Sequence, residues 1–212
     1  KQGLTQEFIN FSGKYYQFKD LWMELKPKQK PHPPFWYAGN PATAGRYGAN
    51  FINFGTIESL PATVETFKEN FQKHVDENSS DALQPTEPLY GGTKRIYLAD
   101  TNEEAMRRAR SAYEVYRANF RKPLPGGTWR RPEAYGPIPH VGRYPWDPDF
   151  DQAITGEQLI VGSPATVREF VERYTAESNC NYLVSSVQWG DLSHEEASHS
   201  LGFFTADVMP GF

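Results

Sequence analysis

The sequence predicts an α/β fold built on parallel strands. Short apolar segments of strand type alternate four times with segments whose apolar residues recur at helical spacing. Such alternation is typical of parallel strands joined by crossover helices. Of the 212 residues, 38% are hydrophobic and 23% are charged, which is the composition of a globular protein. Four strand–helix units suit half of an eightfold barrel or an open doubly wound sheet, and the periodicity does not separate the two.

The first half of the chain is predicted to be extended before its first long helix. Phe11 to Leu25 has aromatic residues around a Gly-Lys turn, as in paired strands. The prolines of Lys26 to Pro34 exclude a helix there. Phe35 to Ala38 is predicted as a buried strand, and a turn and a helix lead to a second strand, Asn50 to Gly55. A helix begins near Pro61, because one apolar stripe follows at helical spacing: Val64, Phe67, Phe71 and Val75.

The second half continues the alternation. Thr93 to Asp100 is predicted as a strand and Asn102 to Asn119 as a helix that buries alanines and tyrosines. Ser163 to Glu177 is the next helix, and Asn181 to Gly190 is the last strand. The last helix begins in a capping box that runs from Ser193 to Glu196.

One long segment, Arg121 to Gln158, interrupts this order. It contains seven prolines and five large aromatic residues, with neither a helical nor a strand period. Loops of this length inside a domain are usually functional lids or disordered inserts. The aromatic residues favour a lid that closes over a ligand.

Composition excludes several classes of function. The net charge of −4 gives no electrostatic reason to expect a nucleic acid or an anionic membrane as partner. No apolar run approaches the roughly 20 residues that cross a bilayer. The single cysteine, Cys180, cannot build a disulfide framework, which predicts a cytoplasmic location. Neither the histidines nor Asp147 to Asp151 have the spacing of a metal site, so none is predicted.

The turn from Gly39 to Thr43 has the features of an anion-binding cradle. Its glycine permits a tight turn out of the strand, Asn40 is a good N-cap, and the proline suits the first helical position. The amides of Ala42 and Thr43 would then point outward beside the threonine hydroxyl, and a phosphate would fit there. The later turn from Gly162 to Pro164 follows the same logic, so both capped turns are candidates.

Blocks spread over nearly the whole chain carry a resemblance: FSGKYYQFKDL, KQKPHPPFWYAGNPATAGRYGA, RIYLADTNEEA, LIVGSPATVREFVERY and WGDLSHEEASHSLGFFTADVMPGF. In this order they resemble the bacterial-luciferase-like flavin-dependent monooxygenases. The resemblance implies a (β/α)₈ barrel and usually a homodimer. It also implies reduced FMN, often supplied by a separate flavin reductase, and O₂ that oxygenates a small organic substrate. A branch of this superfamily uses a deazaflavin instead.

The resemblance begins just before the fifth strand of the family pattern. It therefore implies that residues 1–212 are a single partial domain, the C-terminal half of the barrel, with a lid-like insert at about 121–158. The family's N-terminal strands supply residues near the reactive face of the flavin. We therefore assign no catalytic residue in this chain, and we expect the chain alone to be inactive.

The resemblance also assigns roles to single residues. The family holds the FMN phosphate in the turn after the fifth strand, where this chain has Gly39, Asn40 and Thr43. The family often has an acidic residue and then serine where this chain has Gly39 and Asn40. Asn40 can replace the serine as cap and donor, whereas Gly39 leaves the acidic role empty. Trp189, at the end of the last strand, is predicted either as a wall of the flavin or substrate pocket or as a core residue.

Other functions remain open at this point. A flavin-binding relative without turnover, a deazaflavin-dependent oxidoreductase and a sugar-phosphate barrel enzyme all fit the same cradle. For the fold, we expect four parallel strands in sequence order, helices on one side of the sheet and an open inner face. The strands from Phe35 and from Tyr182 should be its edges.

Overall fold

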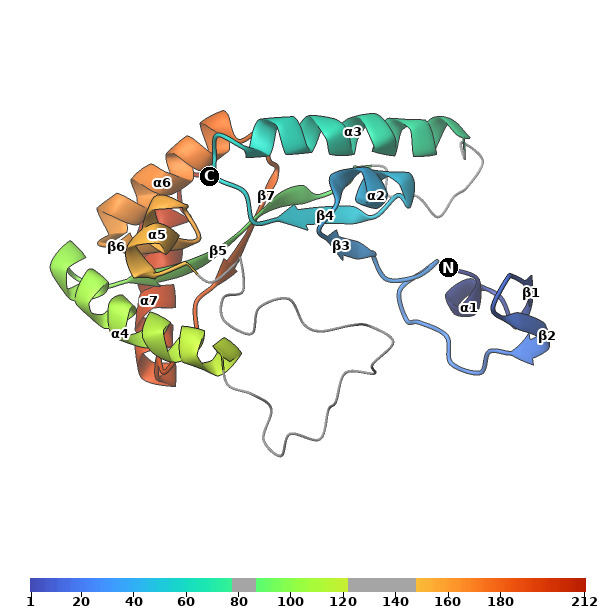
Figure 1. Cartoon of the computed structure of the whole chain (residues 1–212), viewed down its shortest axis with the longest axis horizontal. Coiled ribbons are helices and arrows are strands. Elements are labelled where there is room, and N and C mark those ends of the chain that lie inside the picture. Colours follow the sequence, from blue (N-terminus) through green and yellow to red (C-terminus); the bar gives the residue numbers. More distant parts are fainter. Residues whose placement is uncertain (78–86, 122–147) are drawn as a thin grey trace, which may run out of the picture. The chain divides into compact units, whose positions relative to one another are not determined.

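A computed structural model describes three stretches of the chain: residues 1–77, 87–121 and 148–212 (Figure 1). The chain forms two compact units. The first unit comprises Lys1–Ile52 and Glu65–Tyr90. The second unit comprises Asn53–Val64 and Gly91–Phe212.

An antiparallel hairpin lies near the start of the first unit. A short helix, α1 (Gln2–Thr5), precedes β1 (Phe8–Ser12), which pairs with β2 (Gln17–Trp22) so that Phe8 stands opposite Trp22. The extended conformation predicted for this segment is confirmed. Every residue of β2 is exposed, so backbone pairing rather than burial holds the hairpin within the described part of the chain.

Two parallel strands follow the hairpin. β3 (Trp36–Ala38) leads through α2 (Pro41–Arg46) to β4 (Asn50–Asn53), and β3 pairs with β4 in parallel. The Phe51 amide donates to the Leu89 carbonyl at 2.8 Å, just before the chain enters its longest strand. Within the described ranges β4 is the one partner of β3, so β3 is an edge, as predicted.

The core of the first unit lies between α2, β4 and α3 (Leu60–Glu77). The predicted apolar stripe of α3 is confirmed, because Phe67 and Phe71 are buried with Ala44 and Phe51. The two buried residues of α2 have different neighbours. Ala44 packs in this cluster, whereas a Cβ on Gly45 would lie 2.6 Å from the Phe67 carbonyl oxygen. Gly45 therefore lets α2 approach α3 closely.

One long strand, β5 (Tyr90–Leu98), organises the second unit. Its first part pairs in parallel with β7 (Tyr182–Ser186), and its last part, from Arg95 onward, pairs in parallel with β6 (Leu159–Gly162). The predicted α/β class with parallel strands is confirmed. β6 is an addition to the four predicted strands. In the part of the chain that the structure describes, β7 pairs with β5 alone and is therefore an edge, as predicted.

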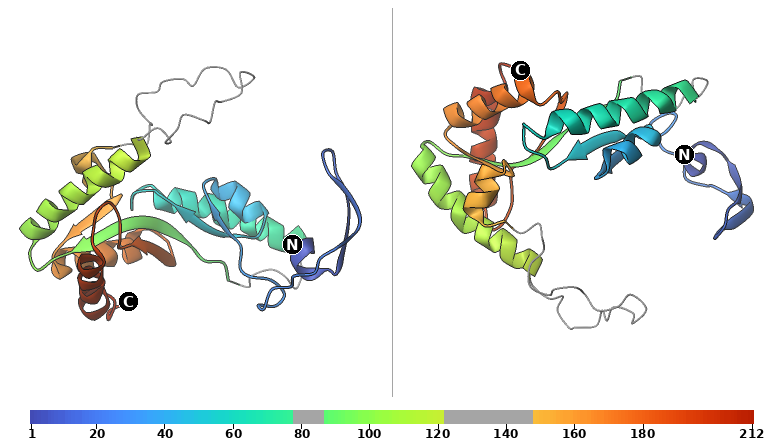
Figure 2. Two further views of the ribbon diagram at one scale, coloured as in Figure 1. Left: turned by 90° about the horizontal axis from the view of Figure 1, so that it is seen from below. Right: turned by 45° about the horizontal axis from the view of Figure 1, so that its top comes forward.

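Helices cover both faces of the β5–β6 pair, whereas one open face was expected. Tyr97 of β5 packs in a cluster that includes residues of α4 (Asn102–Arg121). The alternate residue Ile96 packs in a second cluster against α6 (Pro164–Glu177). Figure 2 shows α4 and α6 on opposite sides of this pair. The expectation of an open face is therefore wrong here, because β6 pairs with the last part of β5 and alternate residues of both strands pack in clusters on the two faces.

The predicted lid, Arg121 to Gln158, lies mostly outside the described residues, including both of its tryptophans. Its last part is described and contains a helix, α5 (Phe150–Thr155), although the sequence predicted no regular structure there. Asp149 and Gln152 form a capping box, and Phe150 is only 1% exposed. Six residues are too few to show a helical period, so the capping box was the available signal.

The segment after β7 is tied back to α4 by ion pairs. α7 (His194–Phe203) begins at the predicted capping box, and a π-helical turn, η2 (Phe204–Val208), follows it. Arg108 of α4 binds Asp191 at 2.9 Å and also binds the Glu196 carboxylate. No helix within the described ranges is both long and apolar enough to span a bilayer.

A buried tyrosine closes the sheet where β5 and β7 begin. The Tyr174 hydroxyl donates to the Tyr182 carbonyl at 2.8 Å and accepts from the Gly92 amide at 2.6 Å. Burial raises the pKa of Tyr174 above its ordinary range, so the hydroxyl keeps its proton as a donor. Removing this hydroxyl would leave two backbone groups without this partner.

We expect Tyr174→Phe to lower the free energy of unfolding by about 1–3 kcal/mol, the cost of buried polar groups that lose a partner. Urea denaturation measures this loss, and hydrogen exchange at the Gly92 amide should accelerate. Tyr15→Phe is the control, because Tyr15 is 80% exposed in the hairpin and its substitution should change little. Equal effects of the two substitutions would contradict the bridging role.

Stability should also depend on pH through Glu196. Its hydrogen bond to Arg108 lowers the pKa of Glu196 from 4.5 to about 2. A carboxyl group whose pKa is lower in the folded chain stabilises the fold at pH values above its unfolded-state pKa. This contribution to the free energy of unfolding is lost as pH falls from about 4.5 towards 2. Glu196→Gln should therefore cost roughly 1–2 kcal/mol at pH 7, after allowance for solvent screening, and progressively less towards pH 2.

Acid and urea titrations of the wild type and of Glu196→Gln measure this difference. Glu195→Gln is the matched control, because Glu195 is an exposed neighbour in the first turn of the same helix. A pH-independent difference between the wild type and Glu196→Gln would show that the ion pair is not the cause.

Candidate functional site

The predicted cradle forms the turn between β3 and α2. Gly39 has φ +130°, a conformation that favours glycine, and the N-cap Asn40 is in an extended conformation. The Asn40 Oδ1 atom accepts from the Thr43 amide at 2.9 Å, so the predicted cap is confirmed. The Thr43 amide is therefore not free, although the sequence predicted that it would point outward as a donor.

A cation missed by the sequence prediction lies beside this turn. Arg46 extends back along α2, and its Nη2 atom lies 3.5 Å from the Thr43 hydroxyl, which can accept from it. Helical side chains lean towards the N-terminus and meet the residue three positions earlier. This spacing from Thr43 was the signal that could have revealed Arg46. Arg46 and Asn40 are both exposed, and Thr43 is half-buried.

These groups form a donor-rich turn. Because the Asn40 oxygen faces the helix, its side-chain NH₂ group remains to donate, and the Ala42 amide lies in the first helical turn. Together with the Thr43 hydroxyl and the Arg46 guanidinium, they suit an oxyanion such as a phosphate. No group of three or more His, Cys, Asp and Glu residues that could hold a metal ion occurs in the described ranges.

The second candidate turn, at the start of α6, is filled by the protein itself. Ser163 caps the helix, but its amide donates to Asn102 Oδ1 at 2.7 Å, and the Thr166 hydroxyl donates to the same oxygen at 2.8 Å. A Cβ on Gly162 would lie 2.7 Å from that oxygen. This turn therefore attaches α6 to the start of α4, and the two similar local sequences have different surroundings.

Trp189 lies in the core of the second unit. It is 6% exposed, and its ring meets those of Tyr97 and Tyr113 edge-on, with centroids 6.5 Å apart in both pairs. Its indole N–H points to the Ile96 carbonyl at 3.4 Å. The sequence left two roles open for Trp189, and these contacts favour the role of a core residue. The role of Trp189 as a wall of a flavin or substrate pocket stays a prediction.

A comparison with protein families identifies the family of the chain. The model of luciferase-like monooxygenases matches residues 1–178, which is most of its length. The chain belongs to this family. The resemblance seen in the sequence is therefore confirmed, and with it the fold class.

One curated relative matches the chain in sequence, and three solved structures share its fold. The uncharacterized protein y4wF of Sinorhizobium fredii is 24% identical over 95% of this chain and 55% of its own. The monooxygenase RslO1 of Streptomyces bottropensis superposes with a TM-score of 0.68 and 19% identity, covering 99% of this chain and 57% of its own.

The other two structures differ in the cofactor named with them. The oxygenating constituent of 3,6-diketocamphane monooxygenase from Pseudomonas putida, in complex with FMN, gives a TM-score of 0.63 at 18% identity, over 99% of this chain and 60% of its own. The coenzyme F420-dependent tetrahydromethanopterin reductase of Methanopyrus kandleri gives a TM-score of 0.62 at 16% identity. This match covers 100% of this chain and 60% of the reductase. The chain thus spans just over half the length of these proteins. The predictions of a single partial domain and of inactivity stay predictions.

The backbone of the cradle can be tested without any ligand. We expect Gly39→Ala to destabilise the chain by about 1–3 kcal/mol, because alanine rarely adopts a φ of +130°. The cause would be the backbone alone, since the new Cβ would make only an ordinary contact, 3.6 Å from Tyr37. Chemical denaturation measures the change.

Gly202→Ala is the control for Gly39→Ala, and we expect it to change stability in the opposite direction. Gly202 lies within α7, and a Cβ added there would meet no atom within 4 Å. Alanine should therefore stabilise the helix by up to about 1 kcal/mol. A Gly39→Ala protein as stable as the wild type would remove the argument that this turn requires glycine.

Proposed function

We propose that Gly39, Asn40 and Thr43 hold the phosphate of reduced FMN. We further propose that the chain is part of a flavin-dependent monooxygenase that uses O₂ on a small organic substrate. One observation carries the proposal: the turn after β3 presents hydrogen-bond donors and a guanidinium around a capped helix start. Membership of the luciferase-like family supports it.

The residues of the turn fit a phosphate group. The Asn40 side-chain NH₂, the Thr43 hydroxyl and the Arg46 guanidinium are all donors, and no acidic residue lies in the first turn of α2. The family's acidic position is glycine here, which leaves no carboxylate at Gly39 to repel a phosphate. Charge-assisted hydrogen bonds of this kind are roughly twice as strong as neutral ones. The fit therefore rests on donors and charge together.

In the proposed reaction, the residues of this chain bind the phosphate of reduced FMN and thereby orient the cofactor. Reduced FMN, when bound, supplies the electrons with which O₂ is activated for oxygenation. A flavin reductase would supply the reduced cofactor, and the whole enzyme would be a homodimer. We assign no catalytic residue within this chain.

A deazaflavin is the second candidate cofactor, because a reductase described as coenzyme F420-dependent shares the fold at a TM-score of 0.62. Parallel titrations with FMN and with the deazaflavin would separate the two cofactors. A flavin-binding protein without turnover is a further alternative. Oxygen consumption by the whole enzyme with reduced FMN and a panel of substrates separates it from the monooxygenase.

We expect Thr43→Ala to weaken FMN binding by about ten- to a hundredfold, since losing a charge-assisted hydrogen bond costs roughly 1.5–3 kcal/mol. Quenching of flavin fluorescence on titration measures the affinity. Ser163→Ala is the matched control, because it alters the helix start whose amide is already bound to Asn102. If Ser163→Ala weakens binding and Thr43→Ala does not, the phosphate site belongs to the second turn.

A further inference from the structure

The pairing of β5 with β7 brings three polar side chains to one face of the sheet. Arg95 stands opposite Ser186, and Thr93 stands opposite Val184. Residues paired in this way, and residues two apart along a strand, point to the same side of a sheet. The Arg95 guanidinium and the hydroxyls of Thr93 and Ser186 therefore share a face, and the three residues are half-buried.

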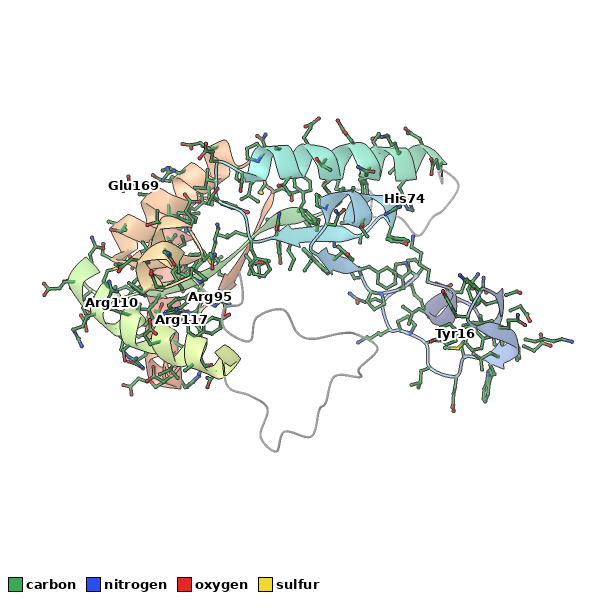
Figure 3. The ribbon with its side chains drawn as sticks, viewed as in Figure 1. Tyr16, His74, Arg95, Arg110, Arg117 and Glu169 are labelled. Carbon is green, nitrogen blue, oxygen red and sulfur yellow. The ribbon has the colours of Figure 1, made fainter. Side chains whose placement is uncertain are left out.

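Arg95 has an aromatic partner but no carboxylate partner in the described part of the chain. Its guanidinium donates to the Tyr116 hydroxyl and lies 4.1 Å from the centroid of the Tyr116 ring. Figure 3 shows Arg95 on the side of β5 towards α4. Five other arginines of this unit lie within 4.0 Å of a carboxylate: Arg108, Arg110, Arg117, Arg168 and Arg173.

Thr93 has a buried hydroxyl for which no partner exists among the described residues. A buried polar group without a hydrogen bond is costly, and such groups in native proteins call for an explanation. The neighbouring cation on the other face is, by contrast, satisfied. Lys94 donates to the Gly55 carbonyl at 2.7 Å, and Glu157 lies 4.0 Å away. On β5, the unpartnered hydroxyl of Thr93 therefore lies on the face that carries Arg95, whereas Lys94 on the opposite face has partners.

We propose that Arg95, Thr93 and Ser186 bind the oxyanion of a small molecule: a carboxylate, a sulfonate or a phosphate. A guanidinium binds such groups through two parallel hydrogen bonds, and its contact with Tyr116 orients it for this. The two hydroxyls would donate to the same oxyanion. The inference goes beyond the proposed FMN site and does not depend on it.

The experiment uses simple anions on the whole chain. Sodium phosphate, sulfate and propionate are titrated at constant ionic strength, with chloride as the reference anion. Binding is followed by the amide chemical shifts of Thr93 and Ser186. We expect saturable shifts with at least one of the three anions, and the strongest binder identifies the class. Arg95→Gln should weaken this binding by about tenfold or more.

Arg110→Gln is the matched control. Arg110 also lies over an aromatic ring, 4.3 Å from the centroid of Phe150, but it is paired with Asp151 at 2.6 Å. Its substitution should leave anion binding unchanged. Equal binding by the wild type and Arg95→Gln, or no saturable shift with any of the three anions, would overturn the proposal.

Two further variants keep the test decisive if Arg95→Gln fails to fold. Thr93→Val removes the unpartnered hydroxyl without changing the shape of the side chain, so it should weaken anion binding while the ligand-free protein loses no stability. Ser186→Ala should also weaken binding. If both variants bind like the wild type, the proposal fails. Repeating the titration in Thr43→Ala separates the sites, because loss there alone would assign the anion to the β3–α2 turn.

Discussion

The hydrogen bonding of β5 is the interaction on which the second unit depends. The strand pairs in parallel with β7 along its first part and with β6 along its last part. Gly91 and Gly92 follow the first residue of the strand, and a Cβ on Gly91 would lie 1.7 Å from the Tyr182 carbonyl oxygen. Tyr174 then joins the two strand starts. With this arrangement fixed, alternate residues of β5 face two separate cores.

Much of this fold could be predicted because its strands and long helices are periodic. The stripe of α3 and the alternation of β5 each repeat over several turns or residue pairs, so local pattern and burial agree. β6 and α5 were missed, because α5 lies inside the segment that shows neither a helical nor a strand period and β6 follows it directly. Their position depends on partners distant in sequence: β6 lies on β5, and Phe150 packs against Tyr113.

The two capped turns show where sequence reasoning about the site ends. Both have an N-cap followed by proline, and both form the predicted cap. What separates them is Asn102, a residue some sixty positions away from Ser163 that occupies the second turn. Arg46, in contrast, was within reach, since it follows Thr43 by one helical turn. The cap was predictable from local chemistry, whereas the residues that surround each turn were set by tertiary structure.

Burial of Lys94 links the stability of the fold to hydroxide concentration. Desolvation lowers the pKa of its amine from 10.5 to about 8. Between these two values the unfolded chain binds a proton at Lys94 that the folded chain has released. Unfolding in mildly alkaline solution therefore takes up a proton at this residue. At this residue, a rise in pH over this interval therefore increases the free energy of unfolding. A lysine whose pKa is raised by an ion pair would have the opposite effect, because its contribution to stability is lost as the pH rises.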